Sequence, residues 1–276
     1  MKSRRKKRPR KRQRKGIFVL PNLFTSASLF GGFYAIIAAI HGRYEAAAIA
    51  IIISSVFDGL DGRIARFTRT ASAFGNEYDS LSDLVAFGVA PAILAYLWAL
   101  EPFGRLGWLA AFMYVICGAL RLARFNVQKD SVDAKFFNGL PIPAAACSIA
   151  SLVLFTSALG GIAGSKPIII IVTIYVLSFL MVSTVNYPSF KEVNIRHRKP
   201  FNVLVSIILI FTVIAYKPQV MLFIIMFSYV FSGPVVTFYR LHKKRSQAKT
   251  AASPIGEENH GHKAVDQEST EQVDTT

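Results

Sequence analysis

The sequence predicts an all-α polytopic membrane protein with about eight transmembrane helices, and three observations lead to this fold class. Hydrophobic residues make up 53% of the 276 residues, and the mean hydropathy is +0.41. Several apolar runs approach about 20 residues, the length of helix that spans a bilayer core. These runs are continuous rather than alternating, so helices satisfy their backbone in lipid better than the strands of a barrel would.

The composition divides the chain into three parts. Residues 1–16 are mostly Lys and Arg and supply much of the net charge of +16; we interpret this block as a cytoplasmic topology determinant attracted to anionic lipids. Residues 17–241 form the predicted transmembrane domain, which holds the candidate functional residues. Residues 242–276 form a polar tail, basic and then acidic, with the composition of a disordered cytoplasmic segment. Nucleic acid binding is not expected, because no folded module or interleaved aromatic residues accompany the charges.

Each predicted span has a recognisable beginning or end. Pro21 and Asn22 precede the first span, and the second becomes polar in its last two turns. Pro91 falls inside the third span, where it either kinks the helix or is tolerated through packing. Gly139 opens the fifth span, and a Gly-rich turn follows it. The predicted spans are residues 23–40, 46–67, 74–100, 108–126, 139–159, 167–185, 201–216 and 220–241.

The distribution of basic residues predicts the orientation. Arg69 follows the second span and basic clusters follow the fourth, sixth and eighth, whereas the other turns hold only isolated basic residues. Lys and Arg concentrate on the cytoplasmic side of membrane proteins. Both termini are therefore expected in the cytoplasm.

Four aspartates in the second and third spans are the main candidates for a functional site. Asp58 and Asp61 are three residues apart, and Asp79 and Asp83 are four apart, so each pair shares one face of a helix. The predicted orientation places all four at the same depth on the cytosolic side. Charged side chains within a membrane are costly, so acids in such a place are functional candidates by default.

Four carboxylates without a nearby His or Cys favour Mg²⁺, Mn²⁺ or Ca²⁺ over zinc or copper. Two such ions suit phosphoryl-type transfer. Arg66 lies about one turn beyond Asp61, where its charge would neutralise a phosphate, and the deepest acid, Asp83, is the candidate to take a proton from an attacking hydroxyl. Gly62 and Gly75 would let a ligand approach the backbone closely.

Two other interpretations of the acids stay open. They pair with neighbouring arginines between helices, or they belong to a divalent-cation transporter. A transporter would place its acids near the membrane midplane, with broken helices and repeat symmetry. Here the acids lie near one surface and no internal repeat is evident, which argues against transport.

The pattern Asp58-x-x-Asp61-Gly62-x-x-Ala65-Arg66, followed after eight residues by Gly75-x-x-x-Asp79-x-x-x-Asp83, resembles the complete signature of the CDP-alcohol phosphotransferases. The resemblance implies that six of the helices form the bundle of that family and that the enzyme is a homodimer. It also implies that the first three aspartates bind two metal ions, Mg²⁺ or Mn²⁺, and that Asp83 binds metal and acts as the catalytic base. By the same resemblance, Gly62, Ala65, Arg66 and Gly75 line the pocket for the cytidine diphosphate.

Asn22 and Thr25 are further candidates for the nucleotide pocket. They either begin the first span at the interface or face the site, and the sequence leaves both readings open.

Four further segments, residues 21–25, 121–126, 137–146 and 182–189, resemble the bacterial phosphatidylserine synthases within that family. This likeness implies an integral enzyme of the bacterial inner membrane with a cytoplasmic active site, which makes phosphatidylserine from CDP-diacylglycerol and L-serine and releases CMP. Arg121 and Arg124 lie at the level of the aspartates, where they either contact the carboxylate of serine or act as positive-inside anchors. Another acceptor, glycerol 3-phosphate or an inositol phosphate, is the alternative, and it would require a denser basic pocket.

Overall fold

The computed structural model describes residues 19–68, 72–128, 136–160, 168–188 and 217–251. The chain separates into two units, Met1–Thr237 and Phe238–Thr276. Of the second unit only the end of the last helix is described.

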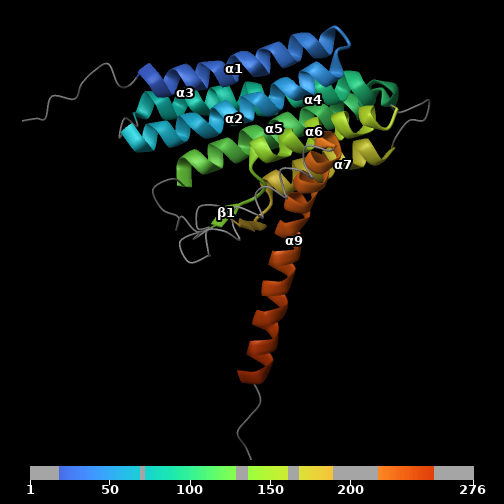
Figure 1. The fold of residues 1–276 in the computed structure, drawn as a ribbon. Coiled ribbons are helices and arrows are strands. Elements are labelled where there is room, and N and C mark those ends of the chain that lie inside the picture. Colours follow the sequence, from blue (N-terminus) through green and yellow to red (C-terminus); the bar gives the residue numbers. More distant parts are fainter. Residues whose placement is uncertain (1–18, 69–71, 129–135, 161–167, 189–216, 252–276) are drawn as a thin grey trace, which may run out of the picture. The chain divides into compact units, whose positions relative to one another are not determined.

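Almost all of the described elements are helices (Figure 1). Two short strands pair antiparallel, with Phe137 opposite Tyr187. The helices are α1 (Val19–Ile40), α2 (Tyr44–Thr68), α3 (Ala73–Asp83), η2 (Leu84–Val89), α4 (Ala90–Ala95), η3 (Tyr96–Leu100), η4 (Glu101–Phe103), α5 (Arg105–Gln128), α6 (Ile142–Ala158), α7 (Ile168–Val182) and α9 (Pro218–Ala251), and the strands are β1 (Phe136–Asn138) and β2 (Asn186–Pro188).

The prediction of an all-α polytopic membrane protein is confirmed. Within the described residues four helices are long and apolar enough to cross a membrane, and two shorter apolar helices, α6 and α7, accompany them. Helix α2 is not among the four, and it carries two of the site's acids. The predicted span at 201–216 lies outside the described residues. The four long apolar helices are Pro21–Ile40, Ala73–Phe103, Arg105–Val127 and Pro218–Phe238.

Small side chains bring the first two helices together. Ala35, Ala38 and Ala39 of α1 are buried, as are Ala47 and Ala48 of α2, and the two helices run side by side (Figure 1). Small residues allow close backbone approach, which is how helices associate without a hydrophobic driving force in lipid. Helix α2 also packs on α6, and α5 packs on α7.

Large apolar side chains point away from this packed interior. Phe30 of α1 and Phe179 of α7 are both 71% exposed. A surface so rich in exposed apolar side chains suits lipid rather than water.

The third predicted span is one helical rod from Ala73 to Phe103 that contains Pro91. A proline cannot donate a backbone hydrogen bond to the carbonyl four residues earlier, which here belongs to Phe87. The hydroxyl of Tyr114, on α5, donates to that carbonyl at 3.1 Å. Packing against α5 therefore supplies a donor that the proline lacks.

The fifth and sixth predicted spans are shorter than expected, because the start of the fifth and the end of the sixth form a different structure. Helix α6 begins at Ile142, after Gly139 has turned the chain with a φ of +84°. A Cβ at Gly139 would lie 2.5 Å from the carbonyl oxygen of Met181. Helix α7 ends at Val182, and β2 follows it to pair with β1.

Candidate active site

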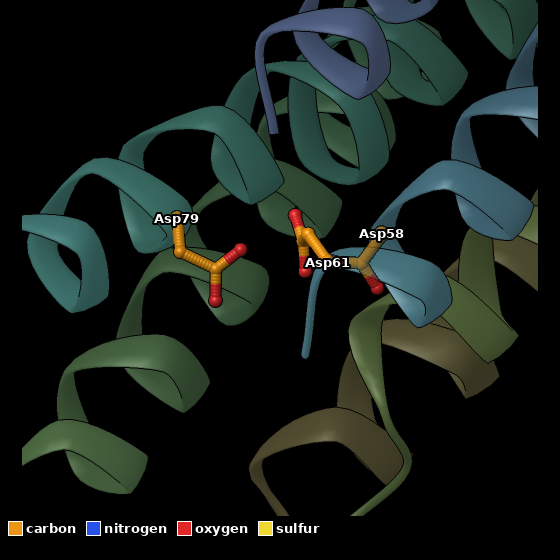
Figure 2. A group of neighbouring side chains, drawn as sticks. All are labelled: Asp58, Asp61 and Asp79. Carbon is orange, nitrogen blue, oxygen red and sulfur yellow. The ribbon is translucent and has the colours of Figure 1, made fainter. Parts of the chain in front are cut away.

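Three of the four predicted aspartates meet where α2 and α3 come together. One carboxylate oxygen from each of Asp58, Asp61 and Asp79 lies within 4.8 Å of the other two. Figure 2 shows Asp79 projecting from α3 toward Asp61 on α2. Asp61 is 5% exposed, and the other two are half-buried. The convergence predicted from the orientation of the spans is therefore present for three of the four acids.

Local sequence sets the position of these acids on their helices. Helix α3 starts at a defined point because Ser72 caps it, with the Ser72 Oγ accepting a hydrogen bond of 3.0 Å from the Gly75 backbone nitrogen. Asp79 then follows Gly75 by one turn and Asp83 by two, on the same face. Because Asp58 and Asp61 share a face of α2, two helices suffice to gather all four.

Asp83 lies deeper along α3 and joins the cluster through Asp58. The charges of the two carboxyl groups interact, and Asp83 is half-buried. It is not part of the group of three oxygens within 4.8 Å. Its position one turn beyond Asp79 separates it from the tightest part of the site.

The donor set fits a hard divalent cation. Carboxylates this close repel one another unless protons or a cation neutralise them. The group consists of oxygen ligands alone, without His or Cys, which is the set that Mg²⁺, Mn²⁺ and Ca²⁺ prefer.

Helix α1 contributes Thr25 to this cluster. The Thr25 hydroxyl donates to Asp61 Oδ2 at 2.8 Å, and it also lies 3.2 Å from the Pro21 carbonyl oxygen. The Thr25 carbonyl accepts a 3.1 Å hydrogen bond from the Ser82 hydroxyl of α3. Thr25 thus faces the site, one of the two readings that the sequence left open, and it ties α1 to both acid-bearing helices.

Asn22 and Gly75 are neighbours across α1 and α3. A Cβ added to Gly75 would lie 3.4 Å from Asn22 Oδ1. Gly62 of α2 is exposed and a Cβ there would meet nothing within 4 Å. The backbone of Ala65 and Arg66 belongs to α2, but their side chains lie outside the described part of the structure.

The two predicted arginines of α5 have different surroundings. Arg124 Nη1 donates to the Val182 carbonyl at 2.9 Å and so holds the end of α7. Arg121 is one turn earlier, and its charge interacts with Asp83 and Tyr229. Its Nε is buried and has no hydrogen-bond partner among the described residues. Of the two arginines, Arg121 is therefore the one whose charge interacts with an acid of the site.

Sequence reasoning missed several polar residues around the site. Ser82 bonds to α1 as described above, and the Ser80 hydroxyl accepts a 3.0 Å hydrogen bond from Asn126 Nδ2 of α5. Ser80 and Ser82 lie between the two aspartates of α3. This polar stretch between two site acids was the feature of the sequence that could have indicated them. Tyr229 had no such signal, because it lies in an apolar run of the last helix.

Comparisons with known proteins agree with this geometry. The family model described as CDP-alcohol phosphatidyltransferase matches residues 18–182. The chain is 40% identical over 195 residues to the CDP-diacylglycerol–serine O-phosphatidyltransferase of Helicobacter pylori (strain ATCC 700392 / 26695), which covers 71% of this chain and 82% of the relative.

Two further relatives extend the likeness. The archaetidylserine synthase of Methanothermobacter thermautotrophicus is 41% identical over 173 residues, covering 61% of this chain and 69% of the relative. The CDP-diacylglycerol–serine O-phosphatidyltransferase of Bacillus subtilis (strain 168) is 35% identical over 173 residues, covering 63% and 92%. With the family model matching more than half of its length, the chain belongs to the CDP-alcohol phosphatidyltransferase family.

Proposed function

We propose that this chain is a CDP-diacylglycerol–serine O-phosphatidyltransferase, which makes phosphatidylserine from CDP-diacylglycerol and L-serine and releases CMP. The observation that carries the proposal is the cluster of Asp58, Asp61 and Asp79 at the meeting of α2 and α3, in a chain of this family. The names of the relatives support serine as the acceptor.

Asp58, Asp61, Asp79 and Asp83 would hold the divalent cations, two ions of Mg²⁺ or Mn²⁺. The ions supply positive charge that binds phosphate oxygens and offsets the charge that develops on them. Thr25 would orient Asp61 through its 2.8 Å hydrogen bond, since partners of metal ligands fix the ligand's geometry.

Asp83 is the proposed general base. It lies beside Asp58 and interacts with the charge of Arg121, so it is close to both the acids and the proposed serine site. The serine hydroxyl oxygen forms a bond to the phosphorus that bears the lipid, and the proton of that hydroxyl passes to the Asp83 carboxylate. The bond from this phosphorus to the phosphate oxygen of CMP breaks, and CMP leaves with the electron pair.

The nucleotide is proposed to bind beside the acids. Asn22 and Gly75 lie together, and Thr25 bonds to Asp61. Gly62 leaves open space above α2, which suits the close approach of a diphosphate to the backbone. Ala65 and Arg66 complete this pocket in the proposal, with Arg66 pairing with a phosphate.

Arg121 is proposed to bind the serine carboxylate. A guanidinium group whose buried Nε lacks a partner among the described residues is ready to accept an anionic ligand, and arginine pairs with carboxylates in a fixed two-point geometry. Arg124 would border the same pocket while it holds the Val182 carbonyl.

We further propose that the site opens to the cytosol of a bacterial cell, with both termini on that side of the inner membrane, and that the enzyme is a homodimer. The lipid substrate would reach the site from the bilayer. The distribution of basic residues along the chain supports this orientation.

The test is CMP release by the purified protein in detergent or lipid. CDP-diacylglycerol and Mn²⁺ or Mg²⁺ are supplied, with L-serine, glycerol 3-phosphate or an inositol phosphate in parallel. Release with serine alone is expected. Release with another alcohol alone would show that this alcohol, and not serine, is the acceptor. If folded protein releases no CMP with any of them, the proposed enzyme activity is wrong, and cation transport is then tested as Mn²⁺ uptake into liposomes.

A further inference from the structure

Asn126 of α5 forms a hydrogen bond with α3 in the stretch between the two site acids of that helix. Its Nδ2 donates to the Ser80 hydroxyl at 3.0 Å, and the Ser80 hydroxyl donates in turn to the Asn76 carbonyl of its own helix at 3.1 Å. Ser80 directly follows Asp79 and precedes Asp83 by three residues. The bond therefore attaches α5 to α3 at the level of the acids.

A second hydrogen bond attaches α5 to the same helical rod, farther along it. The Tyr114 hydroxyl donates to the Phe87 carbonyl at 3.1 Å, and α5 packs along η2. On α5 the tyrosine precedes the asparagine, whereas on the rod the partner of the tyrosine follows the serine. The two helices therefore run antiparallel and are held together at two levels.

Arg121 and Asp83 both lie between these two attachment points. Arg121 follows Tyr114 by seven residues, or about two turns, so it lies on the face of α5 that contacts the rod. Asp83 precedes Phe87 by four residues, or about one turn. The charges of the arginine and the aspartate interact, in agreement with this register. The hydrogen bonds on either side therefore control how far apart the two groups lie.

Helix α3 is also attached to α1, which contributes no residue to the proposed serine site. The hydroxyls of Tyr78 and Ser26 share a hydrogen bond of 2.8 Å, and the Ser82 hydroxyl donates to the Thr25 carbonyl at 3.1 Å. These bonds hold the acids against α1, whereas the bond from α5 holds them against the helix of the proposed serine site.

The shape of the acceptor makes this spacing important. In L-serine two carbon atoms separate the carboxylate from the hydroxyl oxygen. A guanidinium group that binds the carboxylate and a base that takes the hydroxyl proton must therefore lie at one fixed separation. A misplacement of about 1 Å in such an arrangement costs about 100-fold in rate. The length of acceptor that reacts thus depends on the distance between the two groups.

We propose that Asn126 is a positioning residue that sets the length of acceptor the site takes. Its hydrogen bond to Ser80 holds α3 against α5 and fixes the spacing between the Arg121 guanidinium and the Asp83 carboxylate. Serine spans this spacing, whereas an acceptor with one more methylene group does not. This inference rests on the proposed function, because it needs Arg121 to bind the serine carboxylate and Asp83 to act as the base.

The test compares L-serine with L-homoserine, which has the same end groups and one more methylene between carboxylate and hydroxyl. CMP release by the purified protein gives kcat/KM for each, and the ratio of the two values measures the discrimination. The wild type should prefer serine. Asn126→Ala should lower the ratio about tenfold, on the scale of one lost hydrogen bond, with most of the loss on serine.

Ser80→Ala removes the other partner of the same bond and should lower the ratio equally. The double variant should lose no more than either single variant, because the two side chains act through one interaction. Tyr78→Phe is the matched control: it removes a hydroxyl that attaches α3 to α1 and keeps the ring that stacks on Phe74. Its ratio should equal that of the wild type.

An unchanged ratio in Asn126→Ala and Ser80→Ala would overturn this inference, as would an equal fall of the ratio in Tyr78→Phe or a wild type that does not prefer serine to homoserine. If Asn126→Ala does not fold, Ser80→Ala decides alone. A wild type that releases CMP with another alcohol, but with neither serine nor homoserine, would overturn the proposed function together with the inference. A serine-dependent wild type with unchanged ratios in the variants would overturn this inference alone.

Discussion

Thr25 links α1 to the acids through a single buried hydrogen bond to Asp61, at 2.8 Å. We expect Thr25→Val, which has a similar shape, to raise the Mn²⁺ concentration for half-maximal activity about tenfold, because partners of metal ligands contribute on that scale to affinity. Thr25→Ser keeps the hydroxyl and serves as the matched control. Identical metal requirements in the two variants would contradict the role of this bond.

Asp83 carries the proposed proton transfer. Asp83→Asn keeps the size of the side chain but cannot take a proton, and turnover should fall by about 100-fold or more. Glu77→Gln is the control, since Glu77 is an exposed acid on the same helix. Activity is measured as CMP release and folding as thermal unfolding. A folded Asp83→Asn variant with near-normal turnover would remove Asp83 from its role as base.

At the scale of single residues, the sequence predicts which acids form the site better than it predicts the surroundings of the other site residues. A shared site for Asp58, Asp61 and Asp79 was predictable from two signals: helical periodicity fixes which residues of one helix share a face, and the distribution of basic residues places these acids at one depth. The role of Thr25 stayed open, since a threonine near a helix start serves equally as a cap. The environments of Arg121 and Arg124 depend on α7 and α9, which are distant in sequence.

At the scale of the element, Tyr114 and Pro91 tie α5 to the rod that carries Asp79 and Asp83. Tyr114→Phe would leave the Phe87 carbonyl without the donor that now lies at 3.1 Å, and should destabilise the protein by about 1–3 kcal/mol. The measurement is unfolding in mixed micelles. In a Pro91→Ala background the loss should be smaller, because the alanine nitrogen can donate to that carbonyl. An equal loss in both backgrounds would contradict this account.

The helices were predictable as elements, whereas the structure at the start of α6 and the end of α7 was not. Long apolar runs identify spans by composition alone, and residues 23–40 and 108–126 were located within a few residues of α1 and α5. The pairing of β1 with β2 was missed because strands of three residues leave no periodic pattern. The contact of α9 with Tyr187 was equally hidden, since it depends on the absence of a side chain at Gly233, where a Cβ would lie 2.3 Å from Tyr187 Cζ.

At the scale of the whole molecule, the proposed orientation places the acids at the cytosolic face and Glu101 at the opposite end of the helices. Both cysteines, Cys117 and Cys147, are buried and are replaced by alanine for this experiment. In intact bacteria an impermeant maleimide should label Glu101→Cys, whereas Asn76→Cys, near the acids, should react only after the cells are opened. The reverse pattern would contradict the orientation.

The central claim is that the serine hydroxyl attacks the lipid-bearing phosphate at a site that requires divalent cations. Purified protein is incubated with CDP-diacylglycerol and with L-serine that carries ¹⁸O in its hydroxyl group. Parallel reactions contain Mn²⁺ or a chelator, and the products are analysed by mass spectrometry. The account predicts labelled phosphatidylserine, an equal amount of unlabelled CMP, no products with chelator and recovery when Mn²⁺ is restored. Unlabelled lipid, or sustained turnover in metal-free buffer, would contradict it.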